Sequence, residues 1–199
     1  MAKSGGLVIT NLRDLELSAL KYRKYKTNMP QYFVILNFVL FQITWFACVL
    51  GSAKGYPWLG AATVLLFMIW HLSQAKPKLS EAKWCLIALA TGAIFDQVIL
   101  SLGIIQYHNN GWSDSIVPVW ILALWLAFAL TLNVSMRWLR GRYLIALLFG
   151  AIGGPLAYIS AQKLGAVTLG EHSLIALGVG WAVITVAFSK ISTKFDGFK

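Results

Sequence analysis

Asp96 is the side chain in this sequence that is best placed to do chemistry inside an apolar segment. It is the only acidic residue in any of the six apolar segments given below, and it lies near the middle of the third. A carboxylate at the centre of a membrane helix costs about 2.5–3.5 kcal/mol on insertion scales, so it should face protein or a water-filled cavity. The position predicts either a proton-relay or cation site, or a neutral, hydrogen-bonded acid that joins helices.

Further polar side chains lie within the first and fourth segments. Asn37 and Asn133 are at comparable depth, which predicts a hydrogen bond between the two amides across the helices; such bonds average about 0.6 kcal/mol in membranes. Gln42 points to a different side of the first helix, so no continuous polar path follows. Arg137 lies one turn beyond Asn133, and we expect it to extend to the lipid headgroups, with binding of a lipid phosphate as the alternative.

The fifth segment combines small residues with a proline. Gly150 and Gly154 form a GxxxG pattern, which is common where helices approach closely. Pro155 cannot donate a hydrogen bond to the carbonyl of the preceding turn, which predicts a kink with a free acceptor. Tyr158 continues the Gly154 face. Helices of this kind line substrate sites in transporters, but they also serve as ordinary packing devices, and we expect packing.

Three tryptophans lie deeper in the segments than an interfacial belt requires. They are Trp45, Trp125 and Trp181. Their rings suit the wall of a pocket for an acyl or isoprenoid chain, and they suit equally the filling of a helix bundle.

No catalytic, metal or cofactor motif is visible. His71 lies at the inner end of the second segment without a histidine partner for haem, and His108 and His172 lack a metal-binding spacing. Cys48 and Cys85 form no CxxC pair. Nucleophile elbow, P-loop and dinucleotide patterns are absent. We therefore expect no metal or cofactor, and an enzymatic activity is disfavoured.

The composition decides which elements position these residues. Hydrophobic residues make up 58% of the 199 residues and charged residues only 12%, whereas a soluble domain is about 45–50% apolar and about 25% charged. The chain is predicted to be an integral membrane protein. The net charge of +10 comes from lysines and arginines spread between the apolar segments, which favours lipid headgroups over nucleic acid.

Six apolar segments are near the roughly 20 residues that a helix needs to cross a bilayer. They predict an all-α, polytopic membrane protein, a compact bundle of six transmembrane helices within residues 31–192, because the connecting loops are short. The segments run Tyr32–Ala53, Pro57–Gln74, Trp84–Ile105, Ile116–Leu139, Tyr143–Gln162 and Ser173–Ile191.

The distribution of lysine and arginine predicts the orientation. Fifteen of them fall in four segments on one side: the N-terminal tail, residues 73–83, residues 137–142 and the C-terminal end. The other side has only Lys54 and Lys163. Positively charged loops stay in the cytoplasm, so both termini should be cytoplasmic. Residues 1–30 are predicted to be a basic cytoplasmic tail, or a short surface helix on anionic lipid, and residues 193–199 a short cytoplasmic tail.

Several short motifs spread over five segments resemble one family. The first segments carry LNF at 36–38, LFQ at 40–42, WFACVLG at 45–51 and PWLG at 57–60. His71, Asp96 and PVW at 118–120 follow, and later come TLN at 131–133, Trp138-Leu139 and GGPL at 153–156 with Tyr158. In these residues the chain resembles the bacterial integral-membrane family called domain of unknown function 2878. The resemblance covers nearly everything after Met29.

The resemblance implies a multi-pass protein of the bacterial inner membrane without an assigned activity. Members are often encoded near genes for enzymes that resemble cyclopropane-fatty-acid synthases and oxidoreductases. We therefore expect a lipid-associated accessory or binding protein in membrane-lipid modification, with membrane lipids and a membrane-protein partner or second copy as its partners. The alternative is a small proton-coupled transporter or channel that uses Asp96; an intramembrane enzyme comes third.

Overall fold

The computed structural model describes residues 29–199, so the predicted tail over residues 1–30 lies outside the described residues except for its last two positions. The described part is all-α apart from one short two-stranded sheet. Its elements are α2 (Gln31–Ala53), α3 (Trp58–Gln74), α4 (Lys78–Ser101), β1 (Ile105–Tyr107), α5 (Val119–Leu132), the 3₁₀ helix η1 (Arg137–Leu139), α6 (Tyr143–Lys163), β2 (Val167–Leu169) and α7 (Ser173–Ile191).

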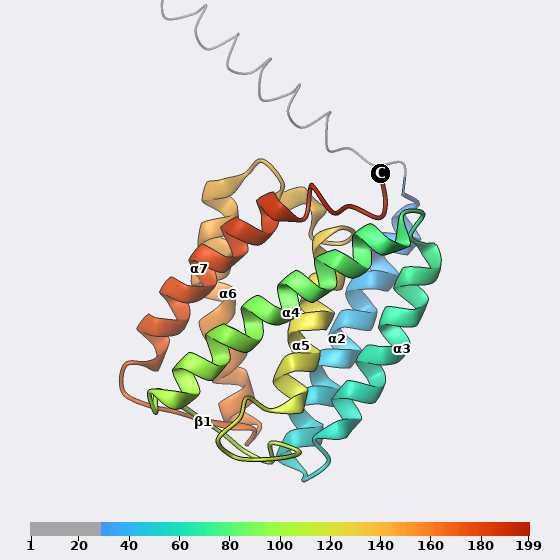
Figure 1. Ribbon diagram of the computed structural model, residues 1–199. Helices are drawn as coiled ribbons and strands as arrows, with labels where there is room; N and C mark the ends of the chain where they lie inside the picture. The colour runs from blue at the N-terminus through green and yellow to red at the C-terminus, as the bar shows by residue number, and fades with distance from the viewer. Residues whose placement is uncertain (1–28) are drawn as a thin grey trace, which may run out of the picture.

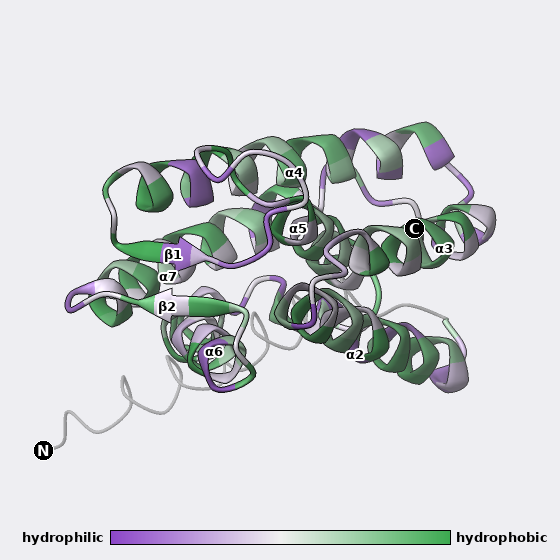
Figure 2. Ribbon diagram, turned by 90° about the horizontal axis from the view of Figure 1, so that it is seen from below, coloured by the Kyte–Doolittle hydropathy of each residue, from purple (hydrophilic) through white to green (hydrophobic). Residues whose placement is uncertain are grey.

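Helix α5 lies in the interior of the bundle, and the other helices are arranged around it (Figure 1). It packs against α2, α3 and α4, and nearly all of its side chains are buried. This fits its sequence, because a helix that is apolar on every side is stable only when it is surrounded. Helices α6 and α7 form a pair that packs closely, and α7 also lies against α4, where Gly180 leaves room for the Phe95 ring. Seen end-on, α2 and α6 lie along one side of the molecule (Figure 2).

Two connections meet at one end of the bundle. Strand β1 follows α4 and pairs antiparallel with β2, which follows α6, so that Ile105 lies opposite Leu169 and Tyr107 opposite Val167. The pairing ties the α4–α5 connection to the α6–α7 connection (Figure 2). Three residues per strand give no clear pattern of alternation, so this two-stranded sheet was not predicted from the sequence.

The third predicted segment is displaced in the structure. Helix α4 begins at Lys78, directly after Pro77, and ends at Ser101, before Gly103 with its φ of +66°. Proline fits the first turn of a helix, where its missing N–H has no partner to lose. The helix therefore starts six residues earlier than the predicted Trp84, and Glu81 lies in its first turn.

The fourth predicted segment is shorter than expected. Helix α5 ends at Leu132 and is followed by turns that lead into η1. Polar side chains occupy the backbone groups that a continuing helix would use: Arg137 donates to the carbonyl of Asn133, and the N–H of Ser135 donates to the side chain of Asn37. Such bonds compete with helical ones and end the helix.

Four helices, α2, α4, α6 and α7, are long and apolar enough to cross a membrane. About a third or less of each apolar stretch is buried, and their outer faces carry large exposed apolar side chains. Helices α3 and α5 are shorter, at 17 and 14 residues. The protein thus has helices suited to a membrane, and little of the α5 surface reaches the outside of the bundle.

Candidate functional site

Asp96 is fully buried and ties four elements together. Its Oδ1 accepts hydrogen bonds from the hydroxyls of Tyr107 on β1 and Tyr158 on α6, each at 2.5 Å. Its Oδ2 accepts a hydrogen bond from the indole Nε1 of Trp125 on α5. We call these four residues the Asp96 cluster. It contains no cation, so three neutral donors stabilise whatever negative charge the carboxyl carries.

The donors fix where a proton on Asp96 would reside. An indole N–H can only donate, so Oδ2 must be an acceptor in either protonation state. A proton on the carboxyl finds hydrogen-bond acceptors beside Oδ1, where the oxygens of the two phenols lie. Burial raises the pKa of Tyr107 well above its ordinary value, and the charge of Asp96 raises it further. The Tyr107 hydroxyl thus keeps its proton and remains a donor.

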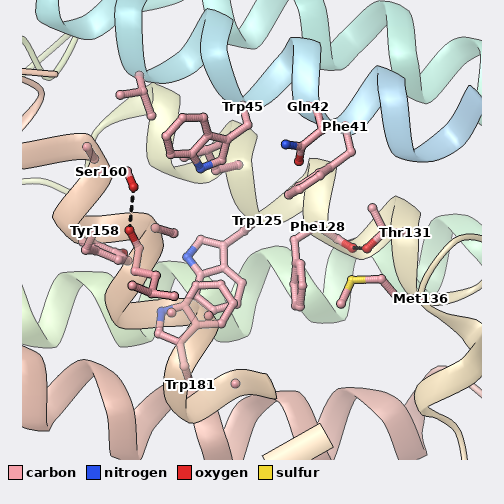
Figure 3. Close-up of a pocket in the computed structure, with 18 of the residues that line it drawn as sticks. Phe41, Gln42, Trp45, Trp125, Phe128, Thr131, Met136, Tyr158, Ser160 and Trp181 are labelled. Atoms are coloured by element: carbon pink, nitrogen blue, oxygen red, sulfur yellow. Dashed lines mark hydrogen bonds between the residues drawn. The ribbon is translucent and has the colours of Figure 1, made fainter. Parts of the chain in front are cut away.

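A cavity of about 740 Å³ lies directly beside the Asp96 cluster. This lateral cavity is bounded by α2, α5, α6 and α7, and its lining is mostly aromatic and aliphatic (Figure 3). Its volume is within the range of roughly 300–1,000 Å³ that is typical of ligand pockets. The lining on α2 extends from Phe38 to Val49, about 16 Å along the axis at 1.5 Å per residue. The cavity is therefore elongated along the axis of α2.

The lateral cavity opens onto the apolar outer faces of α2 and α6. Phe38 and Phe46 on α2 and Leu156 on α6 line it, yet each is about half exposed. Apolar side chains that are exposed around an opening mark a place where an apolar partner enters. The opening thus faces the same surroundings as the outer helix faces.

The predicted deep tryptophans all line the lateral cavity (Figure 3). Trp125 and Trp181 stack with ring centroids 4.7 Å apart and an interplanar angle of 8°, and Trp45 faces the cavity from α2. Trp125 and Tyr158 belong to both the Asp96 cluster and the cavity wall. The buried acid therefore holds two wall residues in position.

The glycine face of α6 packs against α7. A Cβ at Gly150 would collide with the backbone of Trp181, and one at Gly154 would collide with the Trp181 ring. Helix α6 runs without interruption from Tyr143 to Lys163 through Pro155. The two glycines and the proline thus belong to a close α6–α7 contact, and the Gly154 face continues to Tyr158 in the Asp96 cluster.

A second group of polar residues lies at the opposite end of the bundle from the two-stranded sheet. His71 and Glu81 are both fully buried, and His71 Nε2 lies 2.9 Å from Glu81 Oε1. The other ring nitrogen, Nδ1, lies 3.4 Å from Asn37 Nδ2, which also donates to the carbonyl of Leu130. An amide nitrogen donates to Nδ1 only if that nitrogen is unprotonated, so a neutral His71 donates from Nε2 to Glu81.

The same group includes the C-terminal residues. Glu81 Oε2 accepts hydrogen bonds from Asn133 Nδ2 at 2.7 Å and from the N–H of Gly197 at 2.8 Å. Asp196 pairs with Arg137 at 2.5 Å and with Arg140 at 2.7 Å. Two carboxylates thus balance two guanidinium groups. We call this set the Glu81 network: Asn37, His71, Glu81, Asn133, Arg137, Arg140, Asp196 and Gly197.

Two expectations from the sequence were wrong. Asn37 and Asn133 do not bond to each other; they are linked through His71 and Glu81, because the earlier start of α4 brings a carboxylate between them. Arg137 does not extend to the surface but pairs with Asp196. Burial lowers the pKa of Arg137, the charge of Arg140 lowers it further, and the charge of Asp196 opposes both.

The structure brings Asp96 and Tyr158 together, and Gln42 lines the lateral cavity from α2. The sequence did not predict a role for Glu81, in the basic segment 73–83, or for Asp196, in the predicted tail over residues 193–199. Pro77 before Lys78 was a usable signal for the start of α4, and no sequence signal marked Asp196. Among residues 29–199, no three His, Cys, Asp or Glu side chains lie close enough to hold a metal ion.

Comparison with known proteins places the chain in a family. The family described as "Protein of unknown function (DUF2878)" matches residues 34–187. The chain belongs to this family. No curated protein and no solved structure matches it. The DUF2878 region contains the whole Asp96 cluster and most of the Glu81 network, but it ends before Asp196 and Gly197.

Proposed function

We propose that this DUF2878 protein is a six-helix protein of the bacterial inner membrane with both termini in the cytoplasm. Support comes from the positions of the basic segments. The loop before α4 lies beside the C-terminal residues, where the N–H of Lys76 donates to the carbonyl of Gly197, and η1 joins them through the Glu81 network (Figure 1). Lys54 and Lys163 lie at helix ends near the two-stranded sheet. The basic loops thus gather at one end.

Fusions to alkaline phosphatase test this topology. A fusion after Asn109 should be active because residues 106–115 are periplasmic, and a fusion after Lys199 should be inactive. The reverse result at either site would contradict the six-span arrangement.

The second part of the proposal concerns the lateral cavity, which we assign to the apolar chain of a membrane lipid. The observation that carries it is an elongated, aromatic-lined cavity that opens onto exposed apolar helix faces. A soluble substrate would have to reach such an opening through the lipid, whereas a lipid chain is already there. The protein would then act as a lipid-associated accessory or binding protein, and Asp96 would shape the binding wall through Trp125 and Tyr158.

Filling the lateral cavity tests this function. Gly153 lines the cavity, and a Cβ there would touch only the Phe149 ring at 3.9 Å, so Gly153→Trp places a large ring in the cavity without a backbone collision. The matched control is Ile152→Trp, one residue earlier, where the side chain is 59% exposed on the outer face. Native mass spectrometry from mild detergent should show one retained lipid on the wild type and on Ile152→Trp, and none on Gly153→Trp. Equal retention by both variants would overturn the assignment.

A proton-coupled transporter or channel is the second candidate. It is favoured by one observation, that Tyr158 and Trp125 connect the buried Asp96 to the lateral cavity. Proton flux in proteoliposomes under a pH gradient distinguishes the two functions. Flux that Asp96→Asn abolishes in a well-folded protein would place transport first; no flux above empty liposomes would remove it.

A further inference from the structure

The lateral cavity is apolar, yet three polar atoms of its lining residues have no hydrogen-bond partner among the described residues. They are Nε1 of Trp120, Nε1 of Trp181 and Oγ1 of Thr185. All three atoms are buried, and Thr185 and Trp120 are buried as whole residues at 0% and 1% exposure. A buried donor without a partner costs about 1–3 kcal/mol, so native proteins rarely leave one unsatisfied. Three such atoms belong to residues that line one cavity.

The nature of these atoms specifies the ligand group that would satisfy them. An indole N–H is a donor only, and a threonine hydroxyl donates and accepts. The group that satisfies both is therefore an oxygen acceptor. Trp181 and Thr185 are one turn apart on α7 and lie against the Gly150–Gly154 face of α6, so two of the donors lie close together.

Thr131 provides an internal comparison. It is also buried and also lines the lateral cavity, but its hydroxyl already donates to the carbonyl of Phe128 at 2.6 Å. A helical threonine in this wall can thus satisfy its hydroxyl by donating to a backbone carbonyl of the preceding turn. The Thr185 hydroxyl makes no such hydrogen bond. It is therefore free to bind another partner.

We propose that the lateral cavity selects lipids that carry an oxygen acceptor within their buried part, and that Trp181 and Thr185 bind this oxygen. Two sources share this chemistry: an oxygenated fatty-acyl chain, and the ring carbonyl of an isoprenoid quinone, whose ring would also lie against the indoles. The inference rests on the proposed function, because it requires that a lipid chain enters the cavity.

Displacement of radiolabelled stearate from the delipidated protein in mild detergent tests the selection. The competitors are stearate, 10-oxostearate, decylubiquinone and decylbenzene. On the wild type, 10-oxostearate should displace the label at a concentration about tenfold lower than stearate, or decylubiquinone at one about tenfold lower than decylbenzene, because only the first member of each pair has a carbonyl in its buried part. A larger ratio for the oxostearate pair identifies a chain carbonyl, and a larger ratio for the quinone pair identifies a ring carbonyl.

The variant Thr185→Val keeps the shape of the side chain and removes the hydroxyl, and Trp181→Phe keeps an aromatic ring and removes the indole N–H. Each should lower the ratio several-fold, and the double variant should bring it to about one. Thr131→Val is the matched control and should keep the wild-type ratio. If Trp181→Phe fails to fold, the comparison of Thr185→Val with Thr131→Val is sufficient. A ratio of one on the wild type, or a ratio that Thr185→Val leaves unchanged, overturns the selection. Failure of labelled stearate to bind at all would instead contradict the proposed function.

Discussion

The Asp96 cluster and the Glu81 network both bury a carboxylate completely, but they satisfy it in different ways. Glu81 belongs to a group in which two carboxylates face two guanidinium groups, and backbone groups of the C-terminal residues complete the bonding. Asp96 has three neutral donors and no cation. The Glu81 network holds loops and the C-terminal residues to helix ends, whereas the Asp96 cluster shares two side chains with the lateral cavity.

This difference separates a structural role from a role that serves a site. Removing one member of a charge-balanced buried network leaves an uncompensated charge, which costs about 3–5 kcal/mol. Removing one uncharged donor from a buried carboxyl costs less, about 1–3 kcal/mol. We therefore expect changes in the Glu81 network to act mainly on stability, and changes in the Asp96 cluster to act on stability less and on lipid retention more.

The largest effect is expected for Glu81→Leu. It removes the acceptor for His71, Asn133 and the N–H of Gly197, and it leaves the two arginines with one carboxylate. The free energy of unfolding should fall by about 3–5 kcal/mol, as measured by denaturation in mixed detergent micelles. Glu81→Gln keeps one carbonyl acceptor and should lose less. Wild-type stability of Glu81→Leu would show that the network contributes nothing to the fold.

A smaller effect is expected at Asp96, where two variants differ in a defined way. Asp96→Leu orphans all three donors and should destabilise the protein by about 3 kcal/mol. Asn has only one carbonyl oxygen, so it does not reproduce both acceptors of the carboxyl. Its oxygen can accept from Trp125 while its NH₂ donates to the two tyrosine oxygens, which leaves only the two phenol hydrogens without an acceptor.

Asp96→Asn should therefore cost about 1–2 kcal/mol and retain bound lipid. Thermal stability and native mass spectrometry of the two variants together check this. Equal loss of stability in Asn and Leu would show that the hydrogen bonds of the carboxyl do not stabilise the bundle.

The smallest effects are expected from the two tyrosines that donate to Asp96, of which one lines the lateral cavity and the other does not. Tyr107→Phe and Tyr158→Phe each remove one donor to Oδ1 and should each cost about 1 kcal/mol. Only Tyr158 lines the lateral cavity. Lipid retention should fall in Tyr158→Phe and stay at the wild-type level in Tyr107→Phe. The opposite order would separate the Asp96 cluster from the cavity.

The sequence predicted the helical class and four of the six helices to within one residue at each end, because long apolar runs and short polar turns define them. It singled out Asp96 and Tyr158 but not their contact, since partners on different helices depend on packing rather than spacing. Trp45, Trp125 and Trp181 were left open between a pocket and bundle filling, and only the structure shows the cavity between them. The Glu81 network was not predicted because Glu81 lies at the start of a helix and Asp196 lies near the end of the chain. Polar side chains at such positions are usually exposed to solvent.

An experimental structure in lipid nanodiscs is the most direct test that the lateral cavity holds a lipid chain. Elongated non-protein density should lie between α2 and α6 and extend along α5 from the level of Thr131 past Trp125, with Trp181 and Thr185 in contact with it. Closure of α2 onto α6 with no space between them, or a cavity filled by the protein's own side chains, would contradict the assignment of this cavity to a lipid chain.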